Sequence, residues 1–401
     1  MKEISLYFHI PFCRRRCGYC DFNTFAGMNQ YIPAYVKALC SEVEAVLVHA
    51  PEELTAHTLN FGGGTPSLLP PEDFACVFES VRKNASISAE AEISLEANPE
   101  TVTRDGIKAL REAGFNRISF GMQSAASRDL HVLDRQHDNR SILNAVLWSQ
   151  QAGIEHINLD LIFGIPGQSL ESWQRSLQLA VGLGVDHFSI YSLILEDGTR
   201  LKRWVDRGLL QNPDDDLAAD MYLQTMELLE GNGYNQYEIS NWARSAKAEC
   251  RHNLQYWRYK PYLGFGAGAH GFWHDTRTVN VGPIAEYINR IQQDHPVNFP
   301  SGQAVQQSTR LSSWDRIQEN MMVSMRLTRE GVSIPQMNAL YQVEVVNLFG
   351  SQIRKLTRQG LLEFTENGNR MRLTRKGRLF GNRVFSEFID NPLPRGFEAQ
   401  N

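Results

Sequence analysis

The sequence predicts an α/β protein, built as a partial (β/α)6 TIM-like barrel that is followed by a smaller, winged-helix-like domain. Short apolar or alternating runs in the first half are each followed by a longer segment of helical period, which is typical of repeated strand–helix units. About six units are visible, too few for a closed eight-stranded barrel. The predicted strands are 4–9, 56–61, 92–97, 117–121, 157–162 and 187–193.

The returns from helix to strand share one short phrase. It begins at Gly114, Gly153 and Gly184, each followed by an apolar residue and then by the next predicted strand. A glycine in this place is typical of a helix end. Repeated units of this kind imply a parallel sheet with right-handed crossovers, and a doubly wound sheet is the alternative to the partial barrel. In both folds the functional residues lie at the C-terminal ends of the strands.

We divide the chain into three parts: a barrel over residues 1–235, a linking region over 236–308 and a C-terminal domain over 309–401. The pattern changes from about residue 195, and the stretch 195–300 is rich in aromatic residues, glycine and proline, with only patches of helical pattern.

The C-terminal part shows helical patterns over 310–328, 334–341 and 344–358. Two strand-like runs then flank Asn367-Gly368, a strong signal for a hairpin. Helices followed by a hairpin predict the winged-helix-like domain.

The totals exclude several classes of protein. The chain has 401 residues, of which 42% are hydrophobic and 21% charged, with a net charge of −5. This composition is typical of a soluble globular protein, and the mild charge does not indicate a nucleic-acid binder. No apolar run is long enough for a membrane span, and the N-terminus lacks the pattern of a signal peptide. We therefore expect a cytoplasmic protein.

Three of the six cysteines crowd together near the N-terminus. Cys13, Cys17 and Cys20 have the spacing Cys-x3-Cys-x2-Cys. Three thiolates on a cubane cluster leave one iron without a protein ligand, and that iron can chelate the amino and carboxylate groups of a small molecule. The alternatives are a zinc site completed by His9 or Asp21, or three unrelated thiols.

With Tyr19 before the last cysteine, the loop reads Cys-x3-Cys-x-aromatic-Cys after the first strand, and it resembles the signature of the radical S-adenosylmethionine (SAM) enzymes. The phrase from Tyr7 to Cys13 resembles the coproporphyrinogen-dehydrogenase branch of that superfamily. The resemblance implies a [4Fe–4S] cluster on the three cysteines, with Tyr19 packed beside it, and SAM on the open iron.

Polar residues follow the next predicted strands. Gly62-Gly63-Gly64-Thr65-Pro66 follows the second strand, and glycines let a backbone approach a ligand closely. Glu96 closes the third strand, Gln123 follows the fourth and Asp160 lies inside the fifth. Each of these three could be part of a structural ion pair, but together they favour a site at the barrel mouth.

The resemblance divides these residues between two ligands. It implies that one set serves the cluster-bound SAM or its close surroundings, and these residues are Tyr7, Gly63, Gly64, Thr65 and Glu96. It further matches Gln123, Arg135 and Asp160 to positions that hold a second SAM molecule in the dehydrogenase. From its residue type alone, Arg135 could also pair with Asp160 or bind a carboxylate.

Two departures count against decarboxylation of coproporphyrinogen. The dehydrogenases have a fourth cysteine two places after the third, and this chain has Phe22 there. They also have an N-terminal extension before the cluster, whereas twelve residues precede Cys13 here.

The phrase His252-Asn253-x2-Tyr256-Trp257 resembles the marker of the HemW-type heme chaperones. Imidazole is a common axial ligand of heme iron, which makes His252 the candidate ligand, and the aromatic rings suit a flat macrocycle. The alternative is an ordinary aromatic core, and Cys250 is a weaker ligand candidate. The resemblance implies delivery of heme to heme-accepting proteins, such as membrane respiratory enzymes, and a homodimer as the acting form. An oxygen-independent coproporphyrinogen III dehydrogenase remains the alternative.

The C-terminal part carries nine basic residues between positions 351 and 383, Arg354 and Lys355 among them. Because winged helices often bind DNA, a nucleic-acid-binding tail is a second alternative. We favour a solvated or docking surface, and expect no nucleic-acid partner.

Overall fold

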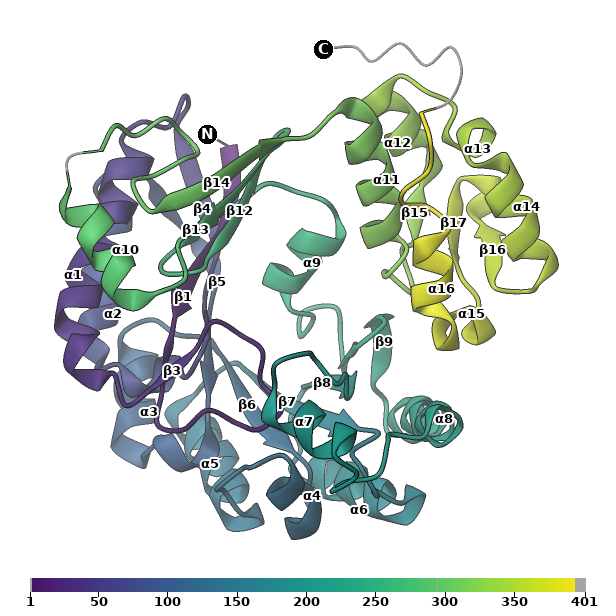
Figure 1. Cartoon of the computed structure of the whole chain (residues 1–401), viewed down its shortest axis with the longest axis horizontal. Helices are drawn as coiled ribbons and strands as arrows, with labels where there is room; N and C mark the ends of the chain where they lie inside the picture. The colour runs from purple at the N-terminus through teal and green to yellow at the C-terminus, as the bar shows by residue number, and fades with distance from the viewer. Residues whose placement is uncertain (1, 294, 394–401) are drawn as a thin grey trace.

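The computed structural model describes residues 2–293 and 295–393 (Figure 1). Six parallel strands form the centre of its main sheet, and each neighbours the next along the chain. Consecutive parallel pairing of this kind confirms the predicted partial barrel. The six strands are β1 (Lys2–Ile10), β4 (Leu54–Gly63), β5 (Ser86–Ala97), β6 (Arg117–Gln123), β7 (His156–Phe163) and β8 (His187–Ser192).

Most of the helices that follow these strands run in an arc along the outside of the sheet, whereas α7 is drawn inside that arc (Figure 1). Ser169 caps α6 by accepting a hydrogen bond from Ser172 N at 3.2 Å, which serine side chains commonly do at a helix start. The helices are α1 (Ile32–Leu47), α2 (Pro71–Arg82), α3 (Arg104–Glu112), α4 (Ser127–Val132), α5 (Asn139–Ala152), α6 (Leu170–Gly182), α7 (Arg200–Asp206) and α8 (Asp215–Gly231).

The glycines of the three repeated returns adopt the left-handed conformation. The φ angles of Gly114, Gly153 and Gly184 are 110°, 76° and 68°. Residues with a side chain rarely take this conformation, so glycine ends each helix at low cost and turns the chain back into the sheet.

The linking region extends the sheet at both edges, to twelve strands in all among the described residues. β11 pairs with β1 in parallel, and β12, β13 and β14 continue from it in antiparallel pairs. At the other edge, β10 pairs with β8 and β9 with β10. These elements are β9 (Asn235–Glu238), β10 (Asn241–Ala243), α9 (Arg251–Trp257), β11 (Tyr262–Phe265), β12 (His270–Trp273), β13 (Thr276–Asn280), α10 (Ile284–Gln292) and β14 (Val305–Arg310).

The C-terminal domain combines helices with a three-stranded sheet of order β15-β17-β16. Its hairpin turns at Asn367 and Gly368, whose φ angles are 56° and 90°, so the predicted hairpin is confirmed. The elements are α11 (Ser313–Ser324), β15 (Val332–Ser333), α12 (Ile334–Tyr341), α13 (Val345–Leu348), α14 (Gly350–Arg358), β16 (Leu362–Thr365), β17 (Arg370–Leu373), α15 (Arg375–Leu379) and α16 (Gly381–Ser386).

Two separate apolar cores support the barrel and the C-terminal domain. The barrel core includes edge-to-face contacts of Phe61 with Phe74 and Phe115, and the second core centres on Trp314 and Phe349. Apolar residues of the linking region, such as Phe265 and Tyr287, belong to the barrel core. We propose that the C-terminal domain is separate and that the linking region packs with the barrel. Among the helices of the described ranges, none combines the length and apolarity that a membrane span requires.

Candidate functional site

The cysteine loop lies at the C-terminal end of β1. Cys13 ends the short strand β2 (Phe12–Cys13), and the loop returns through β3 (Phe25–Ala26), which pairs with β2 in parallel. Cys13 is buried, whereas Cys17 and Cys20 are half-buried. Burial and the neighbouring thiols raise the pKa of Cys13 and of Cys20. A metal ion that binds here must therefore displace their protons.

A chain of polar contacts joins two of the cysteines from behind. Thr65 Oγ1 donates to Cys13 Sγ at 3.6 Å and accepts from Asn98 Nδ2 at 3.0 Å. Arg135 completes the chain, because its Nη2 donates to Asn98 Oδ1 at 2.8 Å and its Nη1 donates to Cys17 Sγ at 3.7 Å. We call this arrangement the polar chain. It places a fixed positive charge beside the thiols, which suits an anionic cluster.

The sequence-based pairing of Arg135 with Asp160 is wrong for the residues that the structure describes. Arg135 donates instead to the carbonyl of Gly121 at 2.8 Å and to the polar chain. Asp160 accepts from Ser119 Oγ at 2.8 Å and from Asn158 Nδ2 at 2.7 Å, and burial raises its pKa. Neutral donors on the adjacent strands thus satisfy the carboxylate, which leaves the guanidinium free to serve the cysteine loop.

The glycine turn after β4 packs directly on the cysteine loop. Gly64 N donates to Ile10 O at 2.9 Å, and Thr65 N donates to Phe12 O at 2.8 Å. A Cβ atom on Gly64 would lie 2.6 Å from Phe12 O, and Gly63 has a φ of 108°. Both positions therefore require glycine, for lack of space at Gly64 and for backbone conformation at Gly63.

A pocket of about 380 Å³ opens beside this turn. Glu96 reaches the pocket from the end of β5 and accepts from Gly63 N at 3.1 Å. Although the side chain is open to the pocket, the surrounding barrel and the charge of Asp160 raise the pKa of Glu96 to about 7. The lining residues are Tyr7, His9, Phe22, Asn23, Gly63, Glu96, Tyr256, Tyr262, Gly268 and His270.

Two further predicted residues, Gln123 and Tyr19, lie at the end of β6 and within the cysteine loop. Gln123 is buried at the end of β6 with a φ of 61°, and its amide lies with Arg135 over Gly121. A left-handed residue other than glycine is uncommon and clusters at functional sites. Tyr19 packs against an apolar cluster that includes Leu133 and Leu201.

No group of three or more His, Cys, Asp or Glu side chains in the described ranges lies close enough to hold a single metal ion. His9, the first candidate for a fourth zinc ligand, is hydrogen-bonded through Nδ1 to Tyr7 OH at 3.0 Å and through Nε2 to Asn23 O at 2.9 Å. Both of its ring nitrogens are therefore engaged. The donor set fits a larger cluster better than one zinc ion.

The His-Asn-x2-Tyr-Trp motif forms α9. His252 is 1% exposed, and burial lowers its pKa to about 4, so the ring is neutral. Its Nδ1 is hydrogen-bonded to Thr58 Oγ1 and its Nε2 to Tyr256 OH, both at 2.8 Å. Tyr256 in turn lines the 380 Å³ pocket. The motif thus reaches the pocket through Tyr256, and the hydroxyl group of Tyr256 stands between His252 and the pocket.

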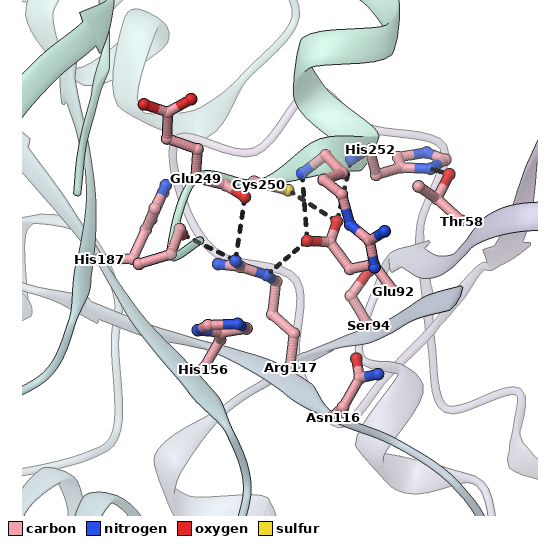
Figure 2. Close-up of polar contacts among 12 residues, drawn as sticks. Thr58, Glu92, Ser94, Asn116, Arg117, His156, His187, Glu249, Cys250 and His252 are labelled. Atoms are coloured by element: carbon pink, nitrogen blue, oxygen red, sulfur yellow. Dashed lines mark hydrogen bonds and ion pairs between the residues drawn. The ribbon is translucent and has the colours of Figure 1, made fainter. Parts of the chain in front are cut away.

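A buried ion pair fixes the start of α9 to the barrel (Figure 2). Arg117 Nε donates to Glu92 Oε2 at 3.0 Å, and both side chains are 3% exposed. Glu92 also accepts from the backbone N–H groups of Arg251 and His252, at 3.1 and 2.9 Å. Burial would raise the pKa of Glu92, but the charge of Arg117 and these N–H groups outweigh it and hold the pKa below its usual value.

We call the ion pair of Glu92 and Arg117 the clamp. It also holds the segment before α9, because Arg117 Nη2 donates to the carbonyls of Ala248 and Glu249, at 2.7 and 3.2 Å. The carboxylate of Glu249 then pairs with Arg329 of the C-terminal part at 2.7 Å. The guanidinium of Arg326 lies 4.2 Å from the ring centre of Trp257. The motif is therefore held from both the barrel and the C-terminal domain.

Sequence reasoning missed Asn98, Glu92 and Arg117. Asn98 stands two places after Glu96, and Glu92 and Arg117 are charged residues within predicted strands. A charged residue in a buried strand needs a partner, so the last two could have been paired as a structural clamp.

Two family models match the chain. The first is described as the radical SAM superfamily and matches residues 7–180, and the second as the HemN C-terminal domain and matches residues 311–380.

Curated relatives match over nearly the whole length. The chain is 36% identical to "Heme chaperone HemW" of Bacillus subtilis, covering 96% of this chain and 99% of that protein. It is 38% identical to the protein of the same name from Mycobacterium tuberculosis, covering 96% and 94%. Among solved structures, coproporphyrinogen III oxidase (HemN) from Escherichia coli superposes with a TM-score of 0.82 at 23% identity, covering 97% of this chain and 90% of that one. This last likeness shows the fold alone.

Proposed function

Because this chain belongs to the radical SAM superfamily, and within it to the family of the HemW heme chaperones, we propose that it binds heme and hands it to heme-accepting proteins. The superfamily implies a [4Fe–4S] cluster and SAM as the resident cofactors. When both are bound, a reduced cluster can supply an electron to the sulfonium of SAM. The recipients we propose are membrane respiratory enzymes, and the acting form a homodimer.

We propose Cys13, Cys17 and Cys20 as the ligands of the cluster. Their support is the shared loop and the polar chain, in which Thr65 and Arg135 donate to two of the three sulfur atoms. Hydrogen bonds to coordinating sulfur atoms stabilise the reduced cluster, and the positive charge offsets its negative charge.

The pocket beside the glycine turn is the proposed SAM site. Tyr7, Gly63 and Glu96 line it. Gly64 and Thr65 follow Gly63 in the turn and join it to the cysteine loop. Gln123, Arg135 and Asp160 lie deeper across the barrel mouth, and we assign them to a second ligand position. Asp160 accepts from Ser119, and Arg135 donates to the carbonyl of Gly121. These separate hydrogen bonds hold both side chains in place before a ligand binds.

One observation carries the heme proposal. Tyr256 of the His-Asn-x2-Tyr-Trp motif lines the same 380 Å³ pocket as Gly63 and Glu96. Since His252 Nε2 is bonded to the hydroxyl of Tyr256, heme iron reaching that nitrogen must displace this hydroxyl. We propose that His252 becomes the axial ligand after a turn of Tyr256.

Anaerobically reconstituted protein tests the function directly. We expect a stoichiometric heme complex by absorption, and no conversion of coproporphyrinogen III to protoporphyrinogen in the presence of SAM and a reductant. Conversion with consumption of SAM would establish the dehydrogenase instead. A mobility shift of duplex DNA at moderate salt would revive the nucleic-acid alternative for the basic C-terminal part.

Replacing His252 with alanine is expected to weaken heme binding by roughly tenfold or more, since the proposed axial bond is lost. The matched variant is His270→Ala, because His270 lines the same pocket outside the motif. Heme titration followed by the Soret band measures both. If only His270→Ala loses heme binding, the axial ligand is His270 and the assignment of His252 is wrong.

The raised pKa of Glu96 predicts a pH-dependent affinity for SAM. Below about pH 7 the carboxyl group of Glu96 is protonated and neutral. Only the ionised form, which prevails above that pH, attracts the sulfonium cation of SAM. Affinity should rise roughly tenfold between pH 5.5 and 7.5 and then level off. Equilibrium dialysis of SAM measures it.

Glu96→Gln should bind SAM weakly, with little dependence on pH over this range. Glu112→Gln, which removes an exposed carboxylate on α3, is the matched control and should follow the parent. An unchanged slope in the Glu96 variant would contradict the assignment.

A further inference from the structure

Two cysteines outside the cluster loop face each other on the outer layer of the barrel. Cys40 lies on α1 and Cys76 on α2, and their sulfur atoms are 2.9 Å apart. A disulfide bond is about 2.05 Å long, so a small movement of two side chains brings these sulfur atoms to bonding distance. Neither thiol has a role in the proposed heme or SAM chemistry.

A second contact one turn further along keeps the two helices in this register. Glu44 is four residues after Cys40, and Ser80 is four residues after Cys76. Ser80 Oγ donates to Glu44 Oε1 at 2.9 Å, and Lys83 Nζ donates to the same oxygen at 2.8 Å. Residues four apart lie on one face of a helix, so the contacts at 40–76 and 44–80 define parallel helices with fixed facing positions. The cysteine pair is therefore part of a regular interface.

The two thiols differ in access. Cys76 is exposed, whereas Cys40 is buried at 7% exposure. Burial raises the pKa of Cys40 to about 12. An oxidant from solution can reach the exposed Cys76 first, whereas Cys40 is buried beside it. This is the arrangement of an attacking thiol and a resolving thiol.

We propose that Cys40 and Cys76 are an oxidation site, at which a low-molecular-weight disulfide converts the two thiols into one intramolecular disulfide. The thiolate of Cys76 attacks one sulfur of the small disulfide, forming a mixed disulfide and releasing one thiolate. Cys40 then loses its proton and attacks Cys76 Sγ, which releases the second thiolate. The two protein thiols are oxidised by two electrons, the small disulfide is reduced to two thiols, and the two protons end on those thiols.

The bond would close a loop that contains the second strand and its turn. Residues 40 to 76 include all of β4 and the glycine turn that packs on the cysteine loop. A closed loop restricts the unfolded chain, so the oxidised form should unfold at a higher temperature. We expect a rise of roughly 5 °C in the unfolding midpoint.

The sequence offers a clean assay. Trypsin cleaves after Lys37 and Arg82 and at no residue between them, so one peptide, 38–82, contains Cys40, Cys76 and no other cysteine. Full-length reconstituted protein is equilibrated anaerobically with mixtures of oxidised and reduced glutathione, quenched in acid and alkylated after unfolding. We expect the peptide from oxidising mixtures to lack both alkyl groups and two hydrogen atoms. Any loss of the cluster leaves this readout unaffected, because the cluster cysteines lie in other peptides.

Cys76→Ser is the matched variant, since it removes one exposed sulfur atom. It should leave Cys40 alkylated in every mixture and abolish the oxidant-dependent rise of the unfolding midpoint. Two alkylated thiols in the parent at all glutathione ratios would overturn the proposal. A glutathione adduct that persists on Cys76 would overturn it as well, because Cys40 would then have failed to resolve the mixed disulfide.

Discussion

Replacing Cys17 with serine should abolish assembly of the [4Fe–4S] cluster. The substitution leaves two thiolates on the loop, and it removes the sulfur atom to which Arg135 donates at 3.7 Å. Because Cys17 is only half-buried, the change should leave the apolar core intact. We expect bound iron and acid-labile sulfide after anaerobic reconstitution to fall roughly tenfold or more, as measured by chemical analysis and by visible absorption.

The matched control for this variant is Cys76→Ser, which removes a thiol from the outside of the barrel. It should bind as much iron as the parent protein. If Cys17→Ser retains a full cluster with unchanged absorption and EPR spectra, the three-cysteine assignment is wrong and another residue must provide the missing ligand.

The second large effect is expected at the buried pair in Figure 2. Replacing Arg117 with methionine leaves the carboxylate of Glu92, which is 3% exposed, without a counter-charge. It also removes the donors to the carbonyls of Ala248 and Glu249. Breaking one side of a buried ion pair typically costs about 3 to 5 kcal/mol, so the free energy of unfolding should fall by that amount. Urea unfolding of the cluster-free protein measures it.

Two further variants separate the buried charge from general damage. Arg117→Met combined with Glu92→Gln should recover part of the loss, since the neutral amide removes the unpaired buried charge and its one oxygen can still accept from Arg251 N or His252 N. Arg111→Met breaks the solvent-exposed pair with Glu155 and should change the free energy of unfolding by about 0.5 kcal/mol or less. Equal losses for the exposed and buried arginines would contradict the clamp.

The fold could be predicted because its signals are local. The strand predicted over 187–193 is observed as β8 over His187–Ser192, and the glycine returns lie where helices end. β5 is longer than the predicted 92–97 and begins at Ser86, where Ser86 and Ile87 pair with Thr55 and Ala56 of β4. The stretch 86–91 alternates polar with small or apolar residues, so the pattern that predicts the strand begins earlier than the predicted bound.

The pairing of distant segments could not be predicted. β11 lies beside β1, with Tyr262 opposite Ser5, although the two strands are far apart along the chain. Periodicity states which residues are buried, and it does not state which strand lies next to which. The linking region therefore appeared separate from the sheet that it extends.

The site shows the same limit. Cys13, Cys17 and Cys20 lie within one loop, so their spacing alone made them a candidate group. The sequence left two roles open for Arg135, pairing with Asp160 or binding a carboxylate. Its bonds to Cys17 and Asn98 depend on the direction of one side chain across the barrel mouth, which the sequence does not predict. The carboxylate of Asp160 accepts hydrogen bonds from Ser119 and Asn158, and no pattern in the sequence predicts these bonds.

The polar chain behind the cysteines draws on residues 13, 65, 98 and 135, which belong to four successive strand–helix units. A chain still under synthesis that has emerged only as far as the glycine turn holds all three thiols, yet it lacks Asn98 and Arg135. Iron delivered at that time would reach a cysteine loop that lacks the hydrogen bonds of the polar chain. We therefore expect the cluster to be assembled after the fourth strand–helix unit has been translated and the barrel has folded.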